Sequence, residues 1–353
     1  MKKLYVLIFI LAIALAVMSG LCSCVGEQNP HDGDHNPQAD QKDPQDDQKD
    51  SQDDQKDSQE EQKNPQEARP EMANFKFIST ATTCEIIGIK DKTVTEIIIP
   101  DYVTSIGDSA FEDCDSFTSI VIPDSVTSIG DRAFYYCNSL ASVTIGNGVT
   151  TIGDGAFEDC VGLTEIIFGS SVTSIGDSAF EGCDILKSVN IPDCVKSIGP
   201  EAFAYCFDLT SVTIGNGVTT IGDSAFDACS SLTSVTLGNS IKVIGKAAFY
   251  HCIKLTSVVI PDSVTDIGGA AFFYCGSLTS VTIGENVVNI GDGAFSYCYK
   301  LESATFKITE GWLVTEASLA TIQTSLSATE LADTSKAAEY LTDTYFGYYW
   351  QRS

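Results

Sequence analysis

The segment Leu209-Thr-Ser-Val-Thr-Ile-Gly-Asn-Gly-Val-Thr-Thr-Ile-Gly-Asp-Ser-Ala-Phe-Asp-Ala-Cys229 is the clearest copy of a unit that repeats every 23 residues. Its Ala-Phe pair returns without an insertion or deletion at Phe111, Phe134, Phe157, Phe180, Phe203, Phe226, Phe249, Phe272 and Phe295. A cysteine follows each of these phenylalanines at the same spacing, from Cys114 to Cys298. A fixed period of this length predicts a solenoid, in which each unit forms one coil stacked on the previous one.

Each unit contains two short stretches that favour β-structure. Leu209, Val212 and Ile214 alternate with polar residues, and Val218 and Ile221 follow on a second side. β-Branched residues in this pattern are typical of strands. The bend between the two sides is Pro-Asp or Gly-Asn, and both pairs suit a tight turn. At the second corner, Gly-Asp-Ser-Ala-Phe, we expect the aspartate to cap a short helical turn. The sequence therefore predicts a mainly β fold with parallel strands, 23-residue coils, short helical corners and terminal caps.

The periodic coils run from residue 94 to residue 306. The preceding segment, 73–93, departs from the period but has apolar runs at Phe75–Ile78 and Cys84–Ile87. Because the end coil of a solenoid must cover its apolar face, we expect these runs to form strands of an N-terminal cap.

After the last coil the period fails, and residues 307–353 are expected to form a C-terminal cap. The composition of Thr334–Leu341 is consistent with a short helix. Tyr345–Trp350 is dense in aromatic residues, which either seal the last coil or provide a platform for a ligand.

The N-terminus has the pattern of an export signal. Two lysines precede the apolar run Leu4–Val17, which is too short to span a bilayer comfortably and is typical of a signal-peptide core. Leu21-Cys22-Ser23-Cys24 resembles the bacterial lipobox, and this resemblance implies a lipoprotein signal peptide, residues 1–23, with lipid attached to Cys24. Val25 stands where an aspartate would resemble an inner-membrane retention signal, which favours the outer membrane. The alternative is an ordinary secretory signal.

Residues 24–72 are expected to form a disordered acidic tether rich in Gln, Asp and Lys. Three seven-residue units in Gln41–Glu61 have no apolar position, so they cannot form a coiled coil or offset their ordering entropy. His31 and His35 lie in this acidic stretch, where solvated side chains are favoured over a metal site, and no metal or cofactor is expected. The net charge of −28 disfavours nucleic acid as a partner.

The coils are similar to the BspA-like leucine-rich repeats, whose pattern reads Leu-x-x-Ile-x-Ile-Pro-x-x-Val-x-x-Ile-Gly-x-x-Ala-Phe-x-x-Cys. Nine coils match this pattern nearly position for position, although Pro200 and Lys246 replace the corner aspartate. The resemblance implies a leucine-rich-repeat solenoid on a bacterial surface lipoprotein, held to the outer membrane by its N-terminal lipid. It also implies an adhesin-like role, binding a protein or glycan on host or other microbial cells. The alternative is a structural, self-associating component of the cell surface.

Catalysis is not expected. The repeat region contains one histidine, His251, with no matched acid or nucleophile, and it lacks Gly-x-Ser-x-Gly and phosphate-binding motifs. A hydrolase that used two carboxylates is the least favoured function, because no pair among the many acids stands out.

The periodic cysteines are expected to be small buried residues rather than disulfides, because their Cβ atoms point in parallel directions in a regular stack. Cys84 lies outside the series, and Cys194 lies on a turn where its thiol is a candidate for exposure. The corner aspartates, such as Asp108 and Asp131, either cap their turns or form a ridge that binds calcium.

The two residues between each Phe and Cys, here called the corner dipeptide, differ from coil to coil. Their aromatic members form the candidate ligand-binding surface, which consists of Tyr135, Tyr136, Tyr205, Tyr250, Phe273, Tyr274 and Tyr297. Partly exposed tyrosines in a row are typical of contact surfaces, and the alternative is that these rings pack on the adjacent corner. A second candidate surface is the strand face that carries Thr144, Thr213, Thr236, Thr282 and Thr305.

Overall fold

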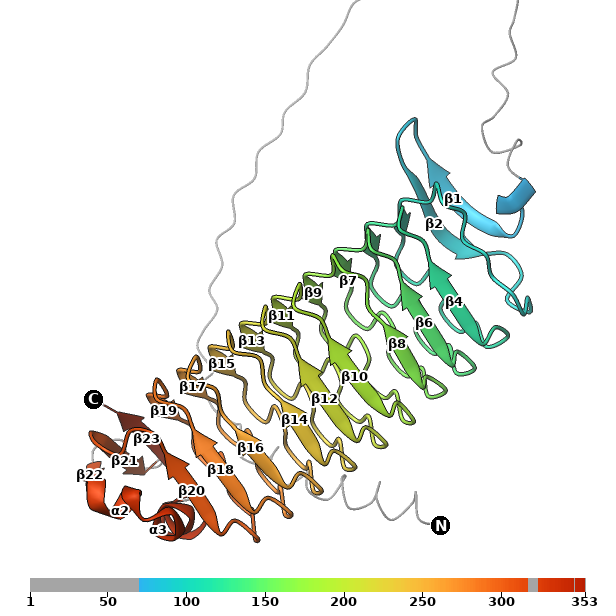
Figure 1. Ribbon diagram of the computed structural model, residues 1–353. Helices are drawn as coiled ribbons and strands as arrows, with labels where there is room; N and C mark the ends of the chain where they lie inside the picture. Colours follow the sequence, from blue (N-terminus) through green and yellow to red (C-terminus); the bar gives the residue numbers. More distant parts are fainter. Residues whose placement is uncertain (1–69, 317–322, 346, 353) are drawn as a thin grey trace, which may run out of the picture. The chain divides into compact units, whose positions relative to one another are not determined.

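The computed structural model describes residues 70–316, 323–345 and 347–352. The signal peptide, the lipid attachment at Cys24 and the tether up to residue 69 lie outside the described residues. The coils are stacked in sequence order, and those from residue 117 to residue 300 each have a longer and a shorter strand (Figure 1). The prediction of a mainly β solenoid with parallel strands is confirmed.

The longer strands form three parallel sheets of three strands each. They are β4 (Ser119–Ile122), β6 (Ser142–Ile145), β8 (Glu165–Ile167), β10 (Ser188–Ile191), β12 (Ser211–Ile214), β14 (Ser234–Thr236), β16 (Ser257–Val259), β18 (Ser280–Ile283) and β20 (Ser303–Phe306). Equivalent residues of neighbouring coils pair, so that Ser211 is the partner of both Ser188 and Ser234. Each repeat position therefore forms a ladder along the solenoid.

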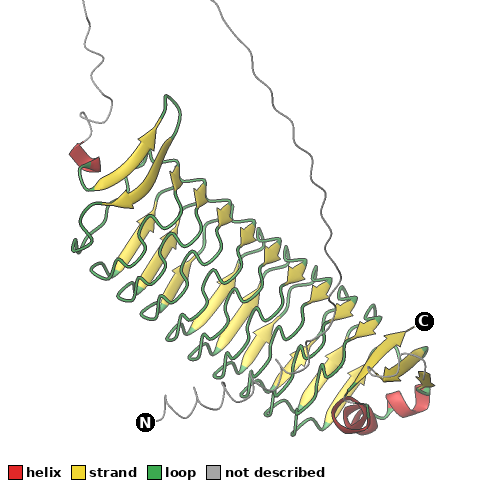
Figure 2. Ribbon diagram, turned by 180° about the vertical axis from the view of Figure 1, so that it is seen from behind, coloured by secondary structure: helices red, strands yellow, loops and turns green. Residues whose placement is uncertain are grey.

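The shorter strands lie together in a separate, continuous sheet, which the cap strands extend to 14 strands (Figure 2). They are β3 (Ser105–Ile106), β5 (Ser128–Ile129), β7 (Thr151–Ile152), β9 (Ser174–Ile175), β11 (Ser197–Ile198), β13 (Thr220–Ile221), β15 (Val243–Ile244), β17 (Asp266–Ile267) and β19 (Asn289–Ile290). In each of them the isoleucine is buried.

The N-terminal end of the stack is covered by a hairpin, β1 (Phe75–Ser79) and β2 (Cys84–Ile89), which pairs with β3. Strands were expected in this segment. A 3₁₀ helix, η3 (Pro70–Met72), precedes the hairpin, and Met72 is only 1% exposed. The packed part of the chain therefore begins before residue 73, the boundary predicted for the end of the tether.

Beyond the last coil, the described residues form three strands and three short helices that close the stack (Figure 1). They are β21 (Trp312–Glu316), β22 (Gln323–Ser325), α2 (Ala328–Ala332), α3 (Thr334–Glu339), the π-helix η4 (Tyr340–Thr344) and β23 (Tyr348–Arg352). The expected helix at 334–341 is thus divided between α3 and η4. Trp350 is 2% exposed, and its ring stacks 5.8 Å from that of Phe306, so at this position the aromatic segment does seal the last coil.

The core is a ladder of phenylalanine rings along the solenoid axis. The rings of Phe111 to Phe295 are fully or almost fully buried, and each stacks on the next with centroids 4.9–5.3 Å apart. The periodic cysteines line the same core as free thiols. From Cys137 onward, each Sγ donates to a phenylalanine carbonyl of the preceding coil at 3.1–3.4 Å. The prediction that these cysteines are buried and unpaired is confirmed for the described residues.

The second corner is a series of three tight turns rather than a helix. Some of its N–H groups bond within the coil, as from Cys114 to the carbonyl of Phe111, and others donate to the next coil, as from Ser109 to Asp131. The expected role of the corner aspartate as a local cap is wrong. Asp108 Oδ1 accepts the backbone N–H of Asp131 at 2.9 Å, and the same bond recurs from coil to coil. Ser109 has a left-handed backbone, φ 51°, which turns its N–H toward the next coil and leaves no helix start to cap.

Candidate binding surface

The backbone of the corner dipeptide is fixed by the residue before it and the residue after it. The Phe before it and the Cys after it are buried in every coil. Its second residue is left-handed, with φ 57° at Tyr136 and 61° at Tyr274, and donates its N–H to the next coil, as from Tyr136 to Glu158 at 3.0 Å. Left-handed geometry costs about 1–2 kcal/mol for a residue with a Cβ, so the stacked coils must enforce it. The side chains themselves are left to vary.

In the late coils the corner side chains meet as one group of rings, here called the aromatic cluster. It consists of Tyr250, His251, Phe273, Tyr274, Tyr297 and Tyr299. The Tyr250 ring stacks on that of Phe273 with their centroids 5.0 Å apart, and the centroids of the Phe273 and Tyr297 rings are 4.8 Å apart. The expectation that these residues lie together is confirmed. The rings pack on adjacent corners, and Tyr297 is still 44% exposed. Their use as a contact surface stays a prediction.

Tyr299 was absent from the sequence-based candidates because it follows Cys298 instead of preceding it. Its ring lies 5.8 Å from both Tyr274 and Tyr297, and it is 68% exposed. In other coils the same position carries residues such as Asp115 and Val161. A comparison of this position across the coils would have identified the tyrosine.

The remaining candidates form two separate groups. Tyr135 and Tyr136 contact each other at 4.5 Å, and the Arg132 guanidinium lies over the Tyr135 ring. Tyr205 is half-buried beside Phe207 in a middle coil. Burial, followed by the neighbouring carboxylate of Asp227, raises the pKa of Tyr205 to about 12. The described ring contacts join neither group to the aromatic cluster.

Acidic side chains occupy several corners of the early and middle coils. Burial and then the charge of Asp159 raise the pKa of Glu158, and burial is also the main cause of the raised pKa of Glu181. Asp227, one coil before the aromatic cluster, has a pKa raised to about 7, mainly because it is buried. Its Oδ1 is buried without a hydrogen-bond partner. From the coil after Asp227 onward, every corner dipeptide carries an aromatic ring and none is acidic.

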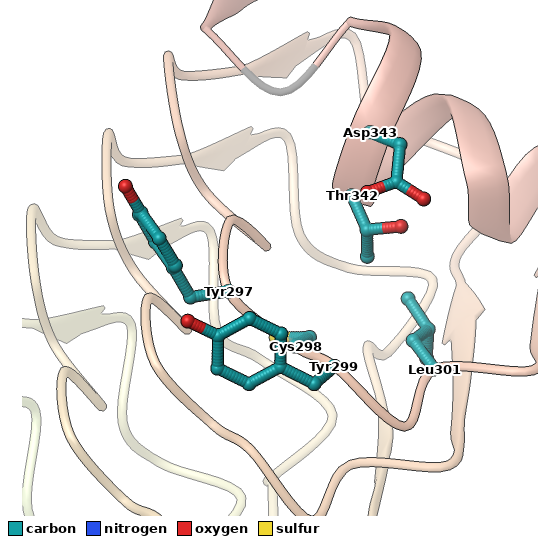
Figure 3. A pocket seen from close by; sticks show the side chains of 6 residues that line it. All are labelled: Tyr297, Cys298, Tyr299, Leu301, Thr342 and Asp343. Atoms are coloured by element: carbon teal, nitrogen blue, oxygen red, sulfur yellow. The ribbon is translucent and has the colours of Figure 1, made fainter.

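A pocket of about 320 Å³ opens where the last coil meets the C-terminal cap. One side is formed by Tyr297 and Tyr299 with Cys298, and the other by Thr342 and Asp343 from η4, with Leu301 beside them (Figure 3). The pocket therefore combines two members of the aromatic cluster with a carboxylate and a hydroxyl group from a non-repeating segment. Periodicity gave no signal for it.

Comparison with known proteins agrees with this geometry. The sequence model of the BspA type leucine rich repeat region matches residues 89–210 and 196–311. The chain belongs to this family. A leucine-rich repeat protein from Bacteroides ovatus has a similar structure, with 31% identity over 66% of this chain and 70% of the other and a TM-score of 0.54. A leucine-rich repeat protein of T. pallidum is 26% identical over 58% of this chain and 88% of the other, with a TM-score of 0.47. No curated protein matches the chain.

The second candidate surface of this BspA-type solenoid is the outer face of the longer strands. Threonines such as Thr213 and Thr236 line a shallow groove of about 330 Å³ in the middle coils. Val121 and Val259, each 63% exposed, occupy the equivalent position in other coils. The face is thus chemically mixed, and it lacks the ring contacts that order the aromatic cluster.

The other reactive side chains of this BspA-type chain, those of His251, Cys84 and Cys194, are buried or half-buried. His251 is half-buried between Tyr250 and Tyr274, and burial lowers its pKa. Cys84 is buried, and Cys194 is half-buried against the core rather than fully exposed. Among the described residues, no three His, Cys, Asp or Glu side chains are placed to hold a metal ion. The same residues include no helix of the length and hydrophobicity that a membrane span requires.

Proposed function

We propose that this BspA-type protein is a bacterial surface binding protein that contacts a protein or glycan on host or other microbial cells through its aromatic cluster. Lipid on Cys24 would hold it to the outer membrane, with residues 24–69 as the tether. The anchor is tested by Cys24→Ser, which should release the chain from membranes into the soluble fraction. Retention of this variant in the membrane would contradict a lipid anchor at Cys24.

The observation that carries the proposal is the exposure of a rigid group of rings that the core does not require. The Phe and Cys that flank each corner dipeptide already close the core beneath it. Tyrosines that are fixed before binding lose little conformational entropy when a partner arrives, and they are frequent at the energetic centre of interfaces. The centroids of neighbouring rings lie 4.8–5.8 Å apart. Because the rings contact one another in this way, their side chains are largely ordered before a partner binds.

The test is capture of candidate host and microbial cells by the immobilised chain. Replacing Tyr250, Phe273 and Tyr274 together with serine should abolish capture and leave the circular dichroism spectrum unchanged. The matched control replaces Glu158 and Asp159, which occupy the same corner in an early coil, and should capture as the wild type does. Undiminished capture by the aromatic variant would remove the cluster as the contact surface.

The second candidate function is a self-associating component of the cell surface. It is favoured by exposed apolar residues on the strand faces, such as Val121, Ile167 and Val259. Sedimentation of the chain decides between the two functions. A monodisperse monomer supports the binding protein, and concentration-dependent assembly supports the structural component.

A further inference from the structure

We infer that the pocket between the last coil and the C-terminal cap binds the end of an uncharged glycan, one or two neutral sugar residues. This inference rests on the proposed binding function and specifies its ligand. It arises from the combination of tyrosine rings on one wall and hydrogen-bonding groups on the other (Figure 3).

The tyrosine wall suits the apolar face of a pyranose ring. The rings of Tyr297 and Tyr299 meet at an interplanar angle of 76°, and Tyr299 is 68% exposed. Aromatic faces carry partial negative charge and attract the weakly positive C–H groups that line one side of a sugar. Because the two rings are nearly perpendicular, a sugar can lie on the face of one ring and meet the edge and hydroxyl group of the other.

The opposite wall suits sugar hydroxyl groups. Asp343 is exposed, and its carboxylate accepts hydroxyl protons in charge-assisted hydrogen bonds. Thr342 Oγ1 donates to the carbonyl of Ala338 at 3.0 Å, so its remaining lone pairs can accept from a ligand. Both residues lie in the π-helix η4, and π-helical turns are rare and often occur at functional sites.

The pocket is built on elements that other contacts already hold in place. Tyr297 has a left-handed backbone, φ 60°, fixed by the corner geometry, and its ring also contacts Phe273 and Tyr274. On the other wall, Tyr340 at the start of η4 donates its hydroxyl proton to Glu330 at 2.7 Å and is 6% exposed. A preformed pocket loses less entropy on binding a small ligand.

Charge selects against acidic sugars. Between Asp292 and Thr344 the sequence contains eight acidic and three basic residues. Two of the basic residues, Lys307 and Lys336, form ion pairs with Asp262 and Glu339. The Asp343 carboxylate in the pocket wall and the acidic excess of this segment therefore disfavour sialic acid, uronic acids and sulfated sugars. At about 320 Å³ the pocket also lies at the small end of ligand sites, which favours a glycan end over a folded protein surface.

The experiment measures binding of the full chain to an array of neutral oligosaccharides and of their sialylated, uronic and sulfated counterparts. Isothermal titration with the best soluble saccharide then gives the dissociation constant. We expect the chain to bind neutral sugars and not the acidic ones. Tyr299→Ala should weaken binding by about tenfold or more, and Asp343→Asn by about threefold to tenfold, as expected for one ring and one charge-assisted bond.

The matched control is Ile253→Ala. Ile253 occupies the position of Tyr299 two coils earlier and is 41% exposed, so its truncation tests for general effects on the solenoid. This variant should bind as the wild type does, and all three variants should retain the wild-type melting temperature. Equal losses in the control and in Tyr299→Ala would overturn the inference.

Other outcomes separate this inference from the proposed function. Absence of neutral-sugar binding, or preference for a quaternary ammonium ion such as choline, overturns the glycan site. If cells are still captured through the aromatic cluster in that case, the binding function stands with a protein as its partner. If neutral sugars bind at Tyr299 and Asp343 but no cells are captured, the site stands and the cell-binding function fails.

Discussion

The same corner of the solenoid is acidic in several early coils and aromatic in the late ones, although its backbone is the same in both. Asp159 in an early coil and Tyr274 in a late one share a left-handed backbone, with φ 56° and 61°, and each donates its N–H to the next coil. In the acidic region burial and like charges raise the pKa of Glu158, whereas in the aromatic region the side chains contact one another. The fold thus tolerates acidic and aromatic side chains alike. The corner backbone is held by the buried Phe and Cys that flank it and by hydrogen bonds to the neighbouring coils.

The largest expected effect concerns what the two regions share. Phe157→Ala in the acidic region and Phe272→Ala in the aromatic region each remove a fully buried ring stacked on both sides. Each should destabilise the protein by about 3–5 kcal/mol, since lost burial and the remaining cavity both contribute. Guanidinium unfolding followed by circular dichroism measures both losses. A clearly smaller loss in one region would show that its corner, and not only its core, supports the fold.

An intermediate effect is expected at Asp227, where the two regions meet. Its folded pKa is about 7, against an ordinary value of 3.8, because burial penalises its charged form. Between these pH values the folded chain retains a proton that the unfolded chain has released, so stability falls as pH rises from about 4 to 7. The full penalty above that range is at most ~4 kcal/mol.

Melting temperatures at pH 5 and pH 8 test this prediction. Asp227→Asn should be more stable than the wild type at pH 8 and should flatten the pH dependence between the two conditions. Asp101→Asn, at an exposed turn, serves as the control and should follow the wild-type profile. If the Asp227 variant kept the wild-type slope, burial of this carboxylate would not be the source of the pH dependence.

The smallest effect concerns the left-handed corner backbone that both regions use. Ala270 has φ 55°, while its equivalents Gly155 and Gly293 are glycines. Ala270→Gly should stabilise the protein by about 0.5–1 kcal/mol, because relief of the Cβ clash exceeds the extra entropy of glycine in the unfolded chain. Gly293→Ala should have the opposite effect. Thermal unfolding of both variants measures the pair, and a destabilising Ala270→Gly would show that the coils impose no strain there.

Much of the fold could be predicted from particular residues. The unbroken spacing of Phe111 to Phe295 determines the solenoid, because each coil must bury its apolar side against its neighbours. The alternation of Val212 and Ile214 marks the longer strand, and the regular cysteines follow as core residues. The late-coil tyrosines could also be placed together, since residues 23 apart become neighbours in space.

Tertiary structure alone decided how the corners are bonded and where the pocket lies. The aspartate and the left-handed residues form hydrogen bonds to the next coil, whereas local sequence rules describe bonds within one turn. The pocket joins Tyr299 of the last coil to Asp343 of the cap, two residues that no period relates. A repeating sequence determines its own neighbours, but the docking of a non-repeating cap depends on packing that only the folded chain creates.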